Sequence, residues 1–100
     1  MKDLPPPTST TPRFRLGRLV ATPGALAALQ KAQSHPIALL VRHMCSDWGE
    51  LDEEDRQQNE IALVAGLRLL SSYSLETGKI VWVITEADRS VTTLLLPEEY

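Results

Sequence analysis

The chain has 100 residues, of which 43% are hydrophobic and 23% charged, and its net charge at pH 7 is −3. This length suits one domain, and this composition excludes a chain that is disordered throughout. No apolar run approaches the ~20 residues of a membrane span, and the first residues lack the apolar stretch of a signal peptide. Cys45 is the only cysteine. An internal disulfide and a cysteine-based zinc cluster are therefore excluded, and we expect a cytoplasmic protein.

The first twelve residues are rich in proline, serine and threonine. Pro5, Pro6 and Pro7 favour an extended polyproline conformation and donate no backbone hydrogen bonds. We therefore expect residues 1–12 to form a flexible tail and residues 13–100 to form a single α+β domain.

Periodicity and capping residues predict seven elements in this domain. In chain order they are a strand over 14–21, helices over 23–33, 36–45 and from Asp52 to near Gly66, and strands over 69–75, 79–85 and 91–96. Thr22 caps the first helix, proline stands at the first position of the first and second helices, and Asp52 caps the third. Apolar residues at helical spacing predict the buried helix faces: Ile37, Leu40, Val41 and Met44 in the second helix, and Ile61, Val64 and Ala65 in the third.

The strand over 79–85 is apolar on both faces, which suits a central strand covered by helices on at least one side. The element order is β-α-α-α-β-β-β. This order predicts an α+β fold, with an antiparallel sheet of about four strands and helices packed on one face.

Charge is divided unevenly along the chain. Residues 1–42 carry six basic groups and one acidic group, a net charge of +5, whereas residues 43–100 carry four basic and twelve acidic groups, a net charge of −8. Such a division can orient a molecule toward a charged partner or a second copy of itself; it can also reflect solvated faces that interleave on folding. Arg13, Arg15 and Arg18 could contact phosphates, but three basic residues in a chain of pI 5.3 fall short of a nucleic-acid footprint.

The first candidate for chemistry is His43 with Asp47. On a continuous helix the two lie one turn apart, so that the carboxylate could orient the imidazole for acid–base catalysis, or both could ligate a metal. The alternative interpretation is structural, with His43 as a cation at a helix C-terminus, Asp47 in a turn and Trp48 packed on the core. No further ligand stands at a diagnostic spacing and no glycine-rich phosphate loop is present, so we predict neither a metal nor a cofactor.

The second candidate is the loop Thr85-Glu86-Ala87-Asp88-Arg89-Ser90. A general base and an arginine that stabilises a phosphorane are what a metal-independent ribonuclease requires. Asp and Ser are also common hairpin residues, and Asp88 with Arg89 could pair or cap locally.

Three stretches of the chain resemble a family of small bacterial proteins. They are residues 11–26, Arg42-His43 with the following Asp47-Trp48-Gly49, and residues 82–100. Members of this family look like cargo of plasmids and integrative elements and have labels such as plasmid-related protein or, in some cases, type I restriction subunit. The resemblance implies a bacterial origin and a mobile-element setting, and it transfers no catalytic residue. A looser likeness, in element order alone, is to barnase- and RelE-like ribonucleases.

Three hypotheses for the function follow. The leading hypothesis is a non-catalytic accessory or regulatory protein of a mobile genetic element, which binds an unidentified protein partner and forms a homodimer. Its predicted binding surface comprises Arg13, Arg15, Arg18, Trp48, Asp88 and Arg89. The alternative is a toxin-like, metal-independent ribonuclease with the candidate catalytic residues His43, Asp47, Glu86 and Arg89. A DNA-binding regulator is the third hypothesis, and the acidic balance disfavours it.

Overall fold

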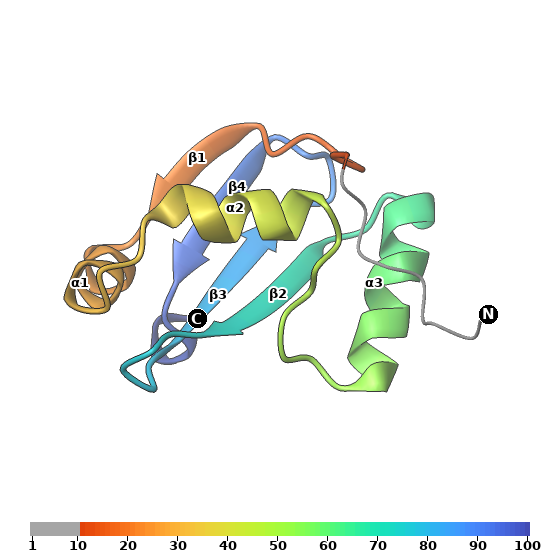
Figure 1. The fold of residues 1–100 in the computed structure, drawn as a ribbon. Helices are drawn as coiled ribbons and strands as arrows, with labels where there is room; N and C mark the ends of the chain where they lie inside the picture. The colour runs from red at the N-terminus through yellow and green to blue at the C-terminus, as the bar shows by residue number, and fades with distance from the viewer. Residues whose placement is uncertain (1–10) are drawn as a thin grey trace.

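The computed structural model describes residues 11–100, so almost all of the predicted tail, residues 1–12, lies outside the described residues. The elements are β1 (Arg18–Ala21), α1 (Pro23–Lys31), α2 (Pro36–Met44), α3 (Glu53–Ala65), β2 (Leu69–Ser74), β3 (Ile80–Thr85), β4 (Val91–Leu95) and the 3-10 helix η1 (Pro97–Glu99). The predicted α+β class and the predicted order of strands and helices are confirmed (Figure 1).

The sheet has the strand order β1-β4-β3-β2, and its last three strands form an antiparallel meander. β1 pairs with β4 in parallel. The sheet is thus mixed rather than wholly antiparallel, because the three helices carry the chain from β1 to the opposite edge before the meander returns it. β3 lies between β2 and β4, in the central position that its apolar composition predicts.

The cap residues act as the sequence predicts. The Thr22 side chain accepts a hydrogen bond from the backbone N–H of Ala25 at 3.0 Å and so begins α1. The Asp52 carboxylate accepts from Asp55 N–H at 2.8 Å and begins α3, and Gly66 ends α3 in the left-handed conformation. These local signals require no tertiary contact, which explains why they predict the boundaries well.

The first strand is shorter than predicted. Residues 13–17 do not pair with a strand; the N–H of Arg13 donates to the carbonyl of Met44 at 2.8 Å instead. Gly17 has a φ of 68°, which interrupts the extended backbone, and regular pairing begins only at Arg18. We call residues 13–17 the N-terminal strap.

The main core lies between the sheet and the helices α1 and α2. Figure 1 shows α2 crossing one face of the sheet, with α3 beside β2. The core consists chiefly of Leu29, Leu40, Tyr73, Val81, Val83 and Leu94. A second cluster joins α3 to β2 and comprises Trp48, Ala62 and Leu69, with Phe14, Leu51 and Leu63 packed against it.

The predicted buried faces of α2 and α3 are partly wrong. Helix α2 buries Leu39, Leu40 and His43, whereas Ile37 and Val41 are about half exposed. Helix α3 buries Asn59 and Ala62, while Ile61 and Val64 are exposed. In both helices a polar side chain occupies the buried face because it satisfies polar groups of the sheet, and apolar neighbours are turned outward.

Candidate functional site

Four buried polar side chains, linked by hydrogen bonds, lie across the helix-covered face of the sheet. They are His43, Ser71, Thr85 and Thr92, and we call them the polar network. His43 of α2 lies 2.6 Å from the Ser71 hydroxyl through Nδ1 and 2.9 Å from the Thr85 hydroxyl through Nε2. The hydroxyls of Thr85 and Thr92 are 2.7 Å apart, and Thr92 donates to the carbonyl of Leu16 in the N-terminal strap at 2.7 Å. All four side chains are fully buried.

The hydrogen bond from Thr92 to the Leu16 carbonyl decides which groups donate and which accept in the polar network. A carbonyl only accepts, so the Thr92 hydroxyl uses its proton on Leu16 and must accept from Thr85. Thr85 then has no proton left for His43, so Nε2 of His43 carries the proton and donates it. Burial lowers the pKa of His43 to about 3, so at pH 7 Nδ1 carries no proton and accepts from the Ser71 hydroxyl. Every side chain of the polar network has a hydrogen-bond partner, and the imidazole is neutral.

The surroundings of His43 also favour the neutral imidazole. The ring of Phe14 meets it edge-on at 5.2 Å between centroids, and Trp48 does so at 5.8 Å. Burial, with a smaller contribution from the charge of Arg89, lowers the pKa of His43 from 6.5 to about 3. His43 is therefore a buried neutral donor and acceptor, not the helix-terminal cation of the structural interpretation.

Asp47 does not contact His43. One of its carboxylate oxygens accepts from Arg42 at 2.7 Å, and the other accepts from the N–H of Gly49 at 3.2 Å. Its own carbonyl accepts from the Tyr73 hydroxyl. Asp47 thus holds the turn between α2 and α3 and ties it to β2.

Trp48 lies in the core rather than on the predicted binding surface. It is 2% exposed, and its Nε1 donates to Glu60 of α3 at 3.0 Å. Arg13 donates to the same carboxylate, at 3.3 Å, and to the Ser46 hydroxyl at 2.9 Å. Arg13 therefore clamps the N-terminal strap to α3 and to the end of α2.

Arg89 joins the loop between β3 and β4 to the C-terminal end of α3. Its guanidinium donates to the carbonyls of Leu67 at 2.7 Å and Ala62 at 3.2 Å, at the C-terminal end of α3, and to the carbonyls of Glu86 and Ala87 at 3.1 Å each. The carbonyl of Ala62 also accepts from the N–H groups of Gly66 and Leu67, so Arg89 adds a further donor at the end of α3. Its donors are thus engaged inside the protein.

The other charged residues of this loop lie at the surface. Glu86 pairs with Arg68 at 3.1 Å. Asp88 is exposed and accepts from the N–H of Ser90 at 3.0 Å; hydrogen bonds from Ser90 lower the pKa of Asp88, and the charge of Arg15 lowers it further. The N-terminal strap thus brings the charge of Arg15 within electrostatic reach of Asp88.

The three stretches that carry the family resemblance converge in space. Phe14 of the first stretch packs on His43 and Trp48 of the second, and Thr92 of the third bonds to Leu16 of the first. By contrast, no hydrogen bond or ion pair joins the side chains of any two of the four candidate catalytic residues, His43, Asp47, Glu86 and Arg89. Arg89 binds only the backbone carbonyl of Glu86, and its charge lowers the pKa of His43. These stretches build a structural centre.

Sequence reasoning missed Phe14, Ser71 and Glu60. Ser71 had a usable signal, because it alternates with Leu69 and Tyr73 and so faces the core in the predicted strand. A serine on such a face requires a polar partner, and His43 is that partner. Phe14 and Glu60 gave no local signal, since their roles depend on the fold.

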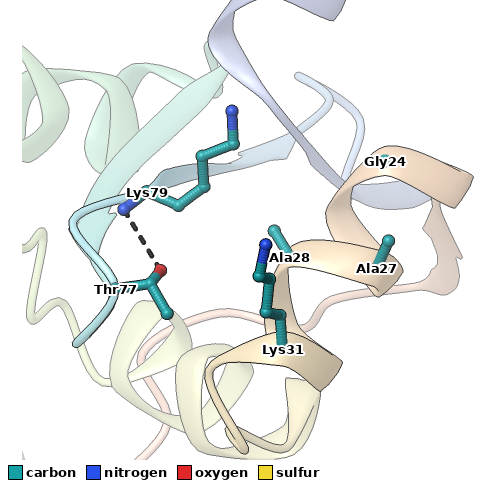
Figure 2. A pocket seen from close by; sticks show the side chains of 6 residues that line it. All are labelled: Gly24, Ala27, Ala28, Lys31, Thr77 and Lys79. Carbon is teal, nitrogen blue, oxygen red and sulfur yellow. Dashed lines mark hydrogen bonds between the residues drawn. The ribbon is translucent and has the colours of Figure 1, made fainter.

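A surface pocket of about 390 Å³ lies away from these residues, between α1 and the turn that joins β2 to β3. Figure 2 shows Lys31 reaching it from α1 and Lys79 from the turn. Lys79 also pairs with Glu98 at 3.7 Å. The residues that line the pocket are Gly24, Ala27, Ala28, Lys31, Thr77 and Lys79. None of them belongs to the sites that the sequence predicts.

Within residues 11–100 no three His, Cys, Asp or Glu side chains are grouped so that they could hold a metal ion. The same part of the chain has no helix long and apolar enough to cross a membrane. Comparison of the chain with protein-family models, with curated proteins and with solved structures finds no match.

Acidification from pH 7 to pH 5 should lower the free energy of unfolding by about 2 kcal/mol through His43 alone. The unfolded imidazole binds a proton near pH 6.5 and the folded one only near pH 3, so the unfolded state gains about 1.4 kcal/mol per pH unit between these values. Urea titrations at several pH values measure this slope. His35→Ala should keep it and His43→Gln should lose it; an unchanged slope in His43→Gln would contradict the assignment.

Proposed function

We propose that this protein is a non-catalytic accessory or regulatory protein that acts by binding another protein. The observation that carries the proposal is that all four candidate catalytic side chains are occupied by structural contacts. His43 is buried on Ser71 and Thr85, Asp47 binds Arg42 and Gly49, Glu86 pairs with Arg68, and Arg89 binds four carbonyls. A general acid or base must reach the proton that it transfers, and these contacts leave none of His43, Asp47 and Glu86 poised to do so. The guanidinium of Arg89, which would stabilise a phosphorane, is used on backbone carbonyls instead.

The surface best suited to a partner is formed by Arg15 and Asp88. Both side chains are exposed. The backbone of the N-terminal strap fixes their positions, because Gly17 packs directly on the carbonyls of Arg89 and Ser90 and the N–H of Arg18 donates to Ser90 at 2.9 Å. A cation and an anion held on a fixed frame give orientation and specificity to an interface more than affinity.

The family resemblance supplies the setting for this role. A small cytoplasmic protein of a bacterial plasmid or integrative element would act on proteins of the element or of the host. The ribonuclease alternative has less support, because the arginines that would hold RNA are partly engaged: Arg13 binds Glu60 and Ser46, and Arg89 binds carbonyls.

A tagged pull-down from a bacterial lysate, split into nuclease-treated and untreated halves, tests this proposal. We expect one stoichiometric protein that survives nuclease treatment. The double variant Arg15→Glu/Asp88→Asn should weaken its capture at least about tenfold, because Arg15→Glu reverses the charge of the surface. Asp88→Asn retains the oxygen that accepts from Ser90, so the loop should stay folded.

The matched control is Lys31→Glu/Glu76→Gln, which changes the net charge by the same amount at other exposed positions. It should bind as the unaltered protein does. Equal capture by both double variants would refute the assigned surface. Bound RNA trimmed at constant positions, with no bound protein, would favour the ribonuclease.

A further inference from the structure

The two edges of the sheet are not equally protected. At the β2 edge the side chain of Asn59 bonds to both backbone groups of Leu70, donating to its carbonyl at 2.6 Å and accepting from its N–H at 3.2 Å. The N–H of Ser72 donates to Trp48 at 3.1 Å, and its carbonyl accepts from Glu50 at 2.7 Å. These contacts close the β2 edge to another strand.

Within residues 11–100 the β1 edge is open. The N–H groups of Arg18 and Thr22 donate to carbonyls beside and in β4, at 2.9 and 3.0 Å. Alternate residues of a strand face the same neighbour, so the backbone groups of Leu19 and Ala21 point away from β4. No hydrogen bond joins these groups to another residue in the described part of the chain. Figure 1 shows β1 at the margin of the sheet, with no helix or strand beyond it.

The side chains of this edge are also exposed. Leu19 is 50% and Val20 40% exposed, although both are large and apolar. Unpaired backbone groups flanked by apolar side chains are a template for another strand. We propose that β1 pairs in antiparallel fashion with β1 of a second copy of this chain, across a twofold axis at Val20. This inference does not rest on the partner-binding role proposed above.

The register follows from which groups are available. With Leu19 opposite Ala21 of the second copy, the two outward-facing residues of each strand exchange both bonds, giving four in all. A shift toward the N-terminus would require extended backbone at Gly17, which has a φ of 68°. A shift toward the C-terminus would require an N–H at Pro23, which has none. The register centred on Val20 is the one that uses all four groups.

Side-chain chemistry favours a second copy over an unrelated peptide. In this register Val20 meets its own counterpart, and Arg18 lies opposite Thr22 of the second copy. The Thr22 hydroxyl donates to Glu99 at 2.6 Å, so a carboxylate stands at that position. Arg18 is exposed and has no ion pair within residues 11–100, so it can meet this carboxylate, and symmetry supplies the contact twice.

Sedimentation velocity between about 5 µM and 500 µM tests the association, because a four-residue strand pair is a small interface and its occupancy should depend on concentration. The average mass should rise toward that of two chains. Val20→Lys places two cations at the twofold axis and should keep the protein monomeric. Ile80→Lys is the matched control, since Ile80 is also 40% exposed but lies in the interior strand β3. It should dimerise as the unaltered protein does.

Oxidative cross-linking tests the register, in a background where buried Cys45 is replaced by alanine. Facing residues of a pair without mutual hydrogen bonds have Cα atoms about 4.5 Å apart, within the range of a disulfide. Val20→Cys should therefore form a covalent dimer, and Leu19→Cys, which faces Ala21, should cross-link far more slowly. A protein that is monomeric throughout, a Val20→Lys variant that still dimerises, or equal cross-linking at both positions would overturn the proposal.

Discussion

Replacement of His43 by alanine is expected to lower the free energy of unfolding by about 4 kcal/mol. The substitution leaves a cavity against Phe14 and Trp48, and it removes the acceptor of Ser71 and the donor to Thr85. Loss of a large buried side chain costs about 2–5 kcal/mol, and each buried polar group without a partner costs about 1–3 kcal/mol, partly relieved where a hydroxyl can rotate to a new acceptor. Urea unfolding of the two proteins at pH 7 measures the difference.

Two controls separate the contribution of the polar network to stability from that of side-chain packing. His35→Ala changes the other histidine, which is exposed and caps α2, and should cost about 1 kcal/mol. The triple variant His43→Leu/Ser71→Ala/Thr85→Val replaces the polar groups together by apolar ones and should be more stable than His43→Ala. If His43→Ala lowered the free energy of unfolding by less than about 1 kcal/mol, the polar network would contribute little to stability.

Replacement of Gly49 by alanine is expected to cost at least about 3 kcal/mol. Gly49 has a φ of 77°, where a Cβ is strained, and the added Cβ would overlap the carbonyl oxygen of Ser72 and press on the Tyr73 ring. The carbonyl is held by the N–H of Glu50 at 2.7 Å, so it cannot move without opening the β2 edge. Thermal unfolding followed by circular dichroism measures the loss.

Gly66 provides the matched control for this prediction. Its φ of 73° is nearly the same, but nothing lies within 4 Å of an added Cβ. Gly66→Ala therefore has only the cost of the left-handed backbone, about 1 kcal/mol. Equal losses in the two variants would assign the whole effect to backbone conformation and none to the contact with β2.

Much of the fold can be predicted from the sequence, because helix caps and apolar runs act over a few residues. Thr22 with Pro23 begins α1, Asp52 begins α3 and Gly66 ends it, each through bonds within a few residues. The apolar run over 79–85 predicts a central strand, and β3 is central. The parallel pairing of β1 with β4 has no local signal, since it depends on the path of the chain through three helices.

The pairing of His43 with Asp47 fails for a conformational reason. It assumes that the helix continues for one more turn, but α2 ends at Met44 and Ser46 has a φ of 61°. The left-handed residue turns the chain, so Asp47 faces Arg42 while His43 faces the sheet. Spacing alone cannot reveal such a turn, because serine rarely adopts this conformation without tertiary support.

The sequence by itself determines the α+β class, the order of the elements and most of their ends, because caps, prolines and alternation act over a few residues. Only the tertiary structure decides which helix faces are buried and what the charged residues do. His43 and Asn59 are placed inside by polar groups on strands distant in sequence, and Arg89 by carbonyls at the end of α3. A buried polar group requires a partner wherever the fold provides one, and no local pattern encodes that partner's position.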